Sequence, residues 1–163
     1  MRMNTSDMAK VEPPLAGSET VFRLIYRSHS LVPATEQNGE LGNILRAARA
    51  ANAARSITGA LLVYDNWFAQ TLEGPEASVR ELFSKIKRDK RHDTVEIRSE
   101  GVVKDRVFSR WAMARVAEHG EADIPLMATA DGVGVAAARK STPDQEAVLN
   151  IMRDATRGYG RGY

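Results

Sequence analysis

The pattern of apolar and polar residues predicts strands and helices in alternation along most of the chain. Residues 21–28 alternate with the period of two that is typical of a strand. Two other segments carry apolar residues at helical spacing, and four more read as strands, two of them joined as a hairpin with Asp65 and Asn66 at its turn. The expected strands are residues 21–28, 56–64, 67–74, 94–103 and 108–117, and the expected helices are residues 41–55 and 74–89.

This order, βαββαββ, predicts an α+β fold of the ferredoxin-like sandwich type, with two helices on one face of a mixed sheet. The two-residue turn sets a register in which Tyr64 pairs with Trp67 and Leu61 with Gln70. Gly59 lies on the same face as Leu61 and Gln70, and we expect it to leave space there. In the second helix, Pro75 suits the first helical position.

The opposite face of the sheet also carries apolar residues and needs a cover, which the C-terminal region can supply. Residues 141–155 predict a helix with Thr142 as its N-cap and Pro143 as its first residue. The expected apolar residues of this helix are Val148, Ile151, Met152 and Ala155. Residues 124–130 predict a shorter helix, and the glycine-rich residues 131–140 predict a connector between the two.

These elements divide the chain into three parts. Residues 1–20 predict a flexible arm, residues 21–117 the sandwich domain, and residues 118–163 a helical extension that ends in a frayed tail. The arm lacks the apolar stretch of a secretory signal, and no apolar run approaches the ~20 residues that cross a bilayer. We therefore expect a cytoplasmic protein that does not associate with membranes.

Three polar side chains lie on the faces that should be buried between the helices and the sheet, namely those of Tyr26, Asn52 and Gln70. Burying them is unfavourable unless they bond one another or a ligand. One hydroxyl and two amides suit a flat heterocycle with alternating carbonyl and N–H groups. Each residue also has a structural interpretation: a core tyrosine bonded to water, an asparagine helix cap, and a glutamine satisfied within the sheet. Periodicity alone therefore predicts a pocket and leaves its ligand open.

Composition and charge exclude several other classes of site. The chain has 163 residues, a formal net charge of +2 and no cysteine, which excludes disulfides and cysteine metal sites and gives no argument for nucleic acid. The three histidines, His29, His92 and His119, lack metal-ligand spacing, so no metal is expected. The basic run at residues 85–92 suits a helix C-terminus and could equally meet a phosphate. No phosphate loop or Ser/His/Asp arrangement supports an enzyme.

Five short segments, in their order and spacing, carry a family resemblance. They are IYRS, ANAARSITGALLVY, FAQTLEG, IKRDKRH and FSRWAM. From about residue 21 to residue 116 the sequence resembles a BLUF domain, the blue-light sensor that uses FAD. The resemblance implies the same ferredoxin-like fold, with the isoalloxazine ring between the two helices. It implies FAD as the cofactor, with FMN and riboflavin as alternatives.

The resemblance also implies a role for each matched residue. Tyr26 corresponds to the photoactive tyrosine, Gln70 to the glutamine between that tyrosine and the flavin, and Asn52 to the asparagine that bonds the flavin pyrimidine edge. The remaining implied site residues are the basic pair Arg91 and His92, near the cofactor, and the Trp-x-Met pair Trp111 and Met113, either of which could face the flavin. Ala51 departs from the pattern, because many relatives carry a second polar residue there.

The implied mechanism is a switch without catalytic turnover. Light moves an electron and a proton from Tyr26, with Gln70 in the path, and Gln70 ends rotated or tautomerised with a stronger bond to the flavin C4 carbonyl. We expect the last strand to pass this change to the C-terminal helices. We also expect a separate downstream protein to receive the signal, and self-association into a homo-oligomer. The alternatives are a light-insensitive ferredoxin-like interaction module, and a small enzyme or RNA binder, although the aromatic-rich basic strands of an RNA-recognition motif are missing.

Overall fold

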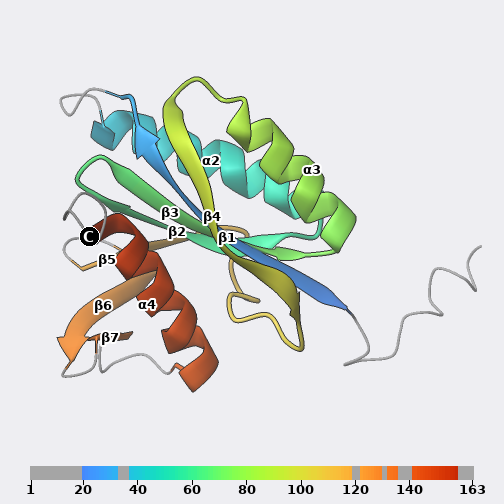
Figure 1. Ribbon diagram of the computed structural model, residues 1–163, viewed down its shortest axis with the longest axis vertical. Helices are drawn as coiled ribbons and strands as arrows, with labels where there is room; N and C mark the ends of the chain where they lie inside the picture. The colour runs from blue at the N-terminus through green and yellow to red at the C-terminus, as the bar shows by residue number, and fades with distance from the viewer. Residues whose placement is uncertain (1–19, 33–36, 119–121, 130–131, 136–140, 158–163) are drawn as a thin grey trace, which may run out of the picture.

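A computed structural model describes residues 20–32, 37–118, 122–129, 132–135 and 141–157 (Figure 1). The predicted arm lies almost wholly outside these residues, and so does the predicted tail after residue 157. The elements are, in chain order, β1 (Val21–Ser30), α2 (Gln37–Ala54), β2 (Thr58–Tyr64), β3 (Trp67–Gly74), α3 (Glu76–Lys87), β4 (His92–Val103), β5 (Ala114–Ala117), β6 (Ile124–Thr129), β7 (Gly132–Val135) and α4 (Pro143–Arg157).

The described strands form one sheet in the order β4-β1-β3-β2-β5-β6-β7. Helices α2 and α3 lie on one face of this sheet and α4 lies on the other (Figure 1). The predicted ferredoxin-like arrangement, with two helices on one face of a mixed sheet, is therefore confirmed. The parallel pairs are β2 with β5 and β5 with β6, and the other neighbours run antiparallel.

The hairpin between β2 and β3 has the predicted register. Tyr64 pairs with Trp67 and Leu61 with Gln70, and Asp65 adopts a φ of 55° at the turn. Strand β1 lies on the other side of β3, where Tyr26 is paired with Gln70. The hairpin turn and the strand period together bring the two residues side by side on one face of the sheet.

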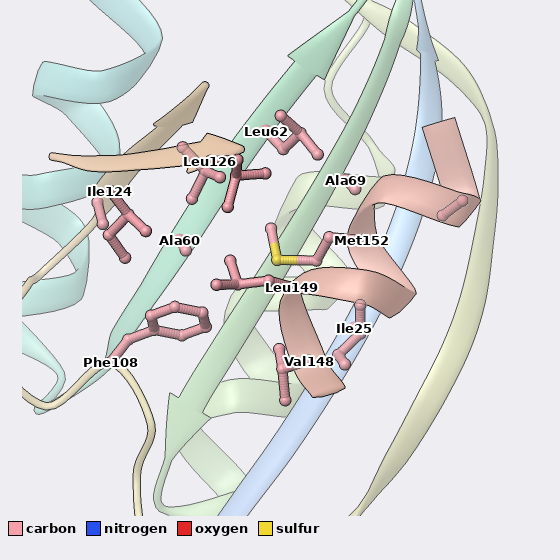
Figure 2. Close-up of a cluster of buried hydrophobic side chains, with 13 residues drawn as sticks. Ile25, Ala60, Leu62, Ala69, Phe108, Ile124, Leu126, Val148, Leu149 and Met152 are labelled. Atoms are coloured by element: carbon pink, nitrogen blue, oxygen red, sulfur yellow. The ribbon is translucent and has the colours of Figure 1, made fainter. Parts of the chain in front are cut away.

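Two apolar clusters fill the layers on either side of the sheet. The cluster under α2 and α3 contains Phe22, Leu24, Tyr26, Leu45, Ile57, Leu61, Phe68, Leu72, Val79, Leu82, Phe83 and Met113. The cluster under α4 contains Ile25, Leu62 and Ala69 of the sheet with Val148, Leu149 and Met152 of the helix, among others (Figure 2). The predicted cover of the second sheet face is thus provided by α4.

Adjacent residues of β1 face opposite layers, as strand geometry requires. Tyr26 belongs to the cluster under α2 and α3, whereas the guanidinium of Arg27 donates to the backbone oxygen of Ala155 in α4 at 3.2 Å. Arg27 also forms an ion pair with Glu96 of β4 at 2.7 Å. Strand β1 therefore contacts both helical layers.

Helix ends agree with the sequence in one case and differ in another. Thr142 caps α4, because its Oγ1 accepts the backbone N–H of Gln145 at 3.1 Å, and Pro143 is the first helical residue, as predicted. Pro75 is the N-cap of α3 with a ψ of 135°, and not the first helical residue. Ile151 was expected in the apolar face of α4, but it is 37% exposed and Leu149 is buried instead.

Two further predictions in the C-terminal third are wrong. Residues 108–117 do not form one strand, and only Ala114–Ala117 does. The carbonyls of the three residues before it, at positions 111–113, are already bonded, by the Gly59 N–H of β2 and by two side chains of α2. Residues 124–130 were expected as a short helix, but Ile124–Thr129 is strand β6, which adds to the open edge of β5. Part of the predicted connector is strand β7, at Gly132–Val135, and its remaining residues lie outside the described ones.

Candidate functional site

A cavity of about 220 Å³ lies between α2, α3 and the sheet. Its wall combines apolar residues with a few polar groups, as small-molecule sites do. The lining residues are Tyr26, Ile44, Ala47, Ala48, Ala51, Asn52, Leu61, Phe68, Gln70, Leu82, Lys85, Ile86, Asp89, Arg91 and His92. The three polar residues that the sequence placed on buried faces, Tyr26, Asn52 and Gln70, therefore meet at one cavity.

Tyr26 and Gln70 form a hydrogen-bonded pair at the floor of this cavity. The Tyr26 hydroxyl donates to Gln70 Oε1, and Gln70 Nε2 donates to Met113 Sδ at 3.6 Å. Tyr26 is 3% exposed and Gln70 is 5% exposed. The buried glutamine is thus satisfied at both ends of its amide, by one strong acceptor bond and one weak bond to sulfur.

The environment of Tyr26 favours its neutral form. Burial raises the pKa of the phenol far above its ordinary value of 10.0, and the negative charge of Asp89 raises that pKa further. The ring also packs against Phe83, with ring centroids 5.2 Å apart. Tyr26 consequently holds its proton at neutral pH and can donate it to Gln70.

This raised pKa predicts a loss of stability at alkaline pH. Above pH 10.0 the unfolded chain releases the Tyr26 proton, whereas the folded chain keeps it. The free energy of unfolding therefore has its full value below pH 10.0 and declines as pH rises beyond it. We expect the free energy of unfolding to fall by about 1.4 kcal/mol more per pH unit above that value in the wild type than in Tyr26→Phe. Urea unfolding followed by circular dichroism measures both slopes, and equal slopes would contradict the prediction.

Asn52 supplies an unpaired acceptor at the cavity. Its Nδ2 donates to the backbone oxygen of Ala112 at 2.6 Å, and its own backbone oxygen accepts the N–H groups of Arg55 and Ile57. Asn52 is 1% exposed, and among the described residues its Oδ1 has no hydrogen-bond partner. The side chain bonds a neighbouring segment and not its own helix end, so the cap interpretation does not hold. A buried acceptor without a partner suits a ligand that presents an N–H group.

Trp111 and Met113 face opposite layers. Met113 is 1% exposed in the cluster that contains Tyr26, directly behind Gln70, although it does not line the cavity itself. Trp111 is partly buried against the cluster under α4, with the Arg110 guanidinium 5.5 Å from its ring centroid. The methionine, not the tryptophan, thus lies on the cavity side.

The basic pair Arg91 and His92, where β4 begins after α3, divides into two roles. His92 is buried and both its ring nitrogens have protein partners, Ser28 Oγ at 2.8 Å and the Ile86 backbone oxygen at 2.6 Å. Arg91 lines the cavity, and its Nη2 lies 2.6 Å from Asp89 Oδ2. That guanidinium lowers the pKa of the Asp89 carboxyl, chiefly by its hydrogen bond, so Asp89 is a carboxylate at neutral pH.

Two charged lining residues were not singled out from the sequence. Lys85 and Asp89 both line the cavity from α3 and the turn after it, four positions apart. Asp89 lies beyond the end of α3 at Lys87, so helical spacing does not relate the two residues, and the signal they share in the sequence is their place in the run at residues 85–92. Ala51 also lines the cavity, so the departure from the family pattern puts a methyl group on its wall.

The expected space beside Gly59 is absent. A Cβ at this position would lie 2.0 Å from the Thr71 backbone oxygen and 3.4 Å from Met113 Cε. Gly59 also does not line the cavity. The glycine is therefore explained by the close approach of β3, and the cavity lies elsewhere on the same sheet face.

Within the described ranges, no group of three His, Cys, Asp or Glu side chains is placed to hold a metal ion. Among the helices of these same ranges, none is long and apolar enough to cross a membrane.

The fold and the cavity define an α+β sandwich domain with a partly polar cavity between two helices and the sheet. The model of the family described as sensors of blue light using FAD, BLUF, matches residues 21–114, which is more than half of the chain. The chain belongs to the BLUF family, whose domains sense blue light through a bound flavin and are not themselves enzymes.

Individual relatives agree with this assignment. The photoactivated adenylate cyclase subunit beta of Euglena gracilis is 36% identical over 110 residues, which are 67% of this chain and 13% of that protein. The chain thus spans only a small part of the length of the curated relatives it matches. The dark-state structure of BlrB, a BLUF protein, is 32% identical with a TM-score of 0.57, over 61% of this chain and 74% of that one. Klebsiella pneumoniae BlrP1 with FMN and cyclic diGMP is 33% identical with a TM-score of 0.52, over 58% of this chain and 25% of that one.

Proposed function

We propose that residues 21–117 form a blue-light photoreceptor domain that binds FAD in the cavity. It signals by rearranging the hydrogen bonds among Tyr26, Gln70 and the flavin, with Met113 as the second protein partner of Gln70. The observation that carries this proposal is a buried hydroxyl–amide–thioether chain beside the unpaired Oδ1 of Asn52. We infer FAD in preference to FMN from the family description, while one structural relative was solved with FMN. Residues 1–20 and 118–163 are proposed as an arm and an extension.

The residues at the cavity suit a flavin. Asn52 Oδ1 and the Gln70 amide would meet the polar edge of the ring, and the apolar wall would meet its faces. Lys85 and Arg91 would bind the phosphate groups of the flavin nucleotide. His92 would instead hold the turn between α3 and β4 in place through its hydrogen bond with Ser28. When bound, the flavin supplies the absorption of blue light and an acceptor for an electron and a proton.

The switch proposed for Gln70 follows from the atoms around it. At present its Oε1 accepts from Tyr26 and its Nε2 donates to Met113 Sδ. Rotation of the amide would turn Nε2 toward Tyr26 and Oε1 toward the sulfur, which has no proton to donate. Two acceptors would then face each other, so Met113 would have to move. That strain would also favour return to the starting arrangement.

The receiver of the signal is proposed to be a separate protein. In the Euglena cyclase subunit the matched region is 13% of the protein, so a sensor of this kind accompanies a much longer chain there. Here we propose that a downstream partner protein and a homo-oligomer of this chain, in the cytoplasm, take part in the output. No nucleic acid or membrane enters the proposal.

One measurement tests the proposed function. The purified protein should be yellow, and its flavin absorption band should shift to the red under blue light and recover in the dark. Chromatography of the released chromophore distinguishes FAD, FMN and riboflavin. A colourless protein that takes up no added FAD would refute the photoreceptor proposal. A coloured protein with no shift would favour the light-insensitive interaction module.

Tyr26→Phe should remove the normal photocycle and leave the fold intact, because only the hydroxyl that donates to Gln70 is lost. Absorption spectra before and after illumination measure the first effect, and circular dichroism measures the second. A red shift of wild-type size and recovery in this variant would show that the hydroxyl is not needed.

A further inference from the structure

The segment between Phe108 and β5 connects the cavity to the rest of the sheet. Its three consecutive carbonyls are all bonded by groups on α2 and β2. The Gly59 N–H donates to Trp111 O at 3.1 Å, Asn52 Nδ2 donates to Ala112 O at 2.6 Å, and Arg49 Nε donates to Met113 O at 3.0 Å. Because Met113 also accepts from Gln70, this segment holds both a switch contact and a contact to Arg49.

Arg49 makes a second bond, to the start of β6. Its Nη2 donates to Asp123 Oδ2 at 3.2 Å. That same oxygen accepts the backbone N–H of Arg115 at 2.8 Å, and the Asp123 N–H donates to the Arg115 oxygen at 2.8 Å. One guanidinium thus joins the backbone of Met113 to the carboxylate that ties β5 to β6.

The value of this contact is geometric. The side chains of Arg49 and Asp123 are 43% and 38% exposed, and an ion pair of that kind contributes little to stability by itself. The planar guanidinium, however, fixes the direction of two bonds at once, which an ammonium group cannot do. Beyond Asp123, Ile124 and Leu126 point into the cluster under α4 together with Leu149 and Met152 (Figure 2).

We propose that Arg49 is a positioning residue that carries a displacement of Met113 to strand β6 through Asp123. This inference rests on the proposed function, since it requires that the Gln70 switch moves Met113. If the Met113 carbonyl moves, its hydrogen bond displaces Arg49, and Arg49 in turn displaces the Asp123 carboxylate, which bonds the backbone of β5 just before β6 begins. The output of the switch is therefore expected at residues 122–129, between the sheet and α4.

The test compares hydrogen exchange of the flavin-loaded protein in darkness and under blue light. In the wild type, exchange over residues 122–129 should differ between the two conditions. Arg49→Gln and Asp123→Asn should each lose that difference and keep the red shift, and the double variant should behave like either single one. Arg46→Gln is the matched control, because Arg46 lies on the same helix and, among the described residues, hydrogen-bonds Asn43 and neither Met113 nor Asp123. The light-dependent difference in exchange over residues 122–129 should be unchanged in this variant.

Arg49→Lys separates a two-bond role from a simple charge. Lysine keeps the positive charge but cannot hold Met113 O and Asp123 together, so we expect the light-dependent difference to be lost in this variant too. A role in folding alone would lower stability in Arg49→Gln without removing the difference.

Several results would overturn the proposal. One is a wild type that shows the red shift but no light-dependent change of exchange in residues 122–129. Another is that Arg49→Gln, Asp123→Asn or Arg49→Lys keeps this change of exchange. A third is that these variants lose the red shift together with the change. A wild type that binds flavin but never shifts would instead refute the proposed function, and the inference with it.

Discussion

Gln70→Leu is expected to bind flavin and to show no light-driven red shift. Leucine keeps the size of the side chain and leaves the cavity wall apolar, but it removes both the acceptor for Tyr26 and the donor to Met113. With no amide to rearrange, the hydrogen bonds around the ring are the same before and after illumination. Absorption difference spectra under blue light measure the loss, and flavin content per protein confirms loading.

Thr71→Val is the matched control for this variant. Thr71 neighbours Gln70 on β3, is fully buried, and its Oγ1 has no partner among the described residues. Valine has the same shape, so the red shift and its recovery should be unchanged. A normal photocycle in Gln70→Leu would show that the glutamine lacks the role proposed for it. Loss of the photocycle in Thr71→Val as well would show that the effect of Gln70→Leu is not specific to the amide.

Glu73→Ala is expected to destabilise the fold by about 3–5 kcal/mol, because it removes one partner of a buried charged network. Glu73 is 0% exposed and its carboxylate accepts from three donors. Its oxygens bond Arg23 Nε at 2.9 Å, the Val107 N–H at 2.9 Å and the Phe108 N–H at 2.9 Å. Alanine leaves the Val107 and Phe108 N–H groups and the Nε of Arg23 without the acceptor they have in Glu73.

Urea unfolding of Glu73→Ala and Glu73→Gln measures this effect. The amide of glutamine retains one oxygen for the backbone N–H groups, so Glu73→Gln should lose clearly less stability than Glu73→Ala. A loss below about 1 kcal/mol in Glu73→Ala, the size of one ordinary hydrogen bond, would contradict the prediction.

The sandwich itself could be predicted because its elements carry clear periods. The apolar stripes placed α3 and α4, and the turn at Asp65 set the register that pairs Leu61 with Gln70. The segments that were misassigned are those where long-range partners decide the backbone. Residues 111–113 are bonded by Gly59, Asn52 and Arg49, which are distant in sequence, so the local pattern of apolar and polar residues does not predict these bonds.

Strand β6 illustrates the same point. Residues 124–130 are short and apolar, and such a run suits a helix or a strand equally well. Its outcome depends on the open edge of β5, with which Val116 and Ile124 pair in parallel. That edge exists only after the sheet has formed, so local propensity could not reveal it.

The candidate site was predictable as far as strand and helix faces go. Tyr26, Asn52 and Gln70 were expected to meet, and in the structure they line one cavity. Which of Trp111 and Met113 faces that cavity depends on the backbone path before β5, and the structure places Met113 behind Gln70. The occupation of both His92 nitrogens by Ser28 and Ile86 also arises only in the folded chain.

The two-sided contacts of β1 have a consequence for how this protein can evolve. Tyr26 bonds Gln70 on one face, and Arg27 bonds Ala155 on the other. An insertion or deletion of one residue within β1 would exchange these faces, and would place an arginine at the cavity and a phenol under α4. Length changes in natural descendants should therefore accumulate in loops and leave this strand's length constant, even where its individual residues diverge.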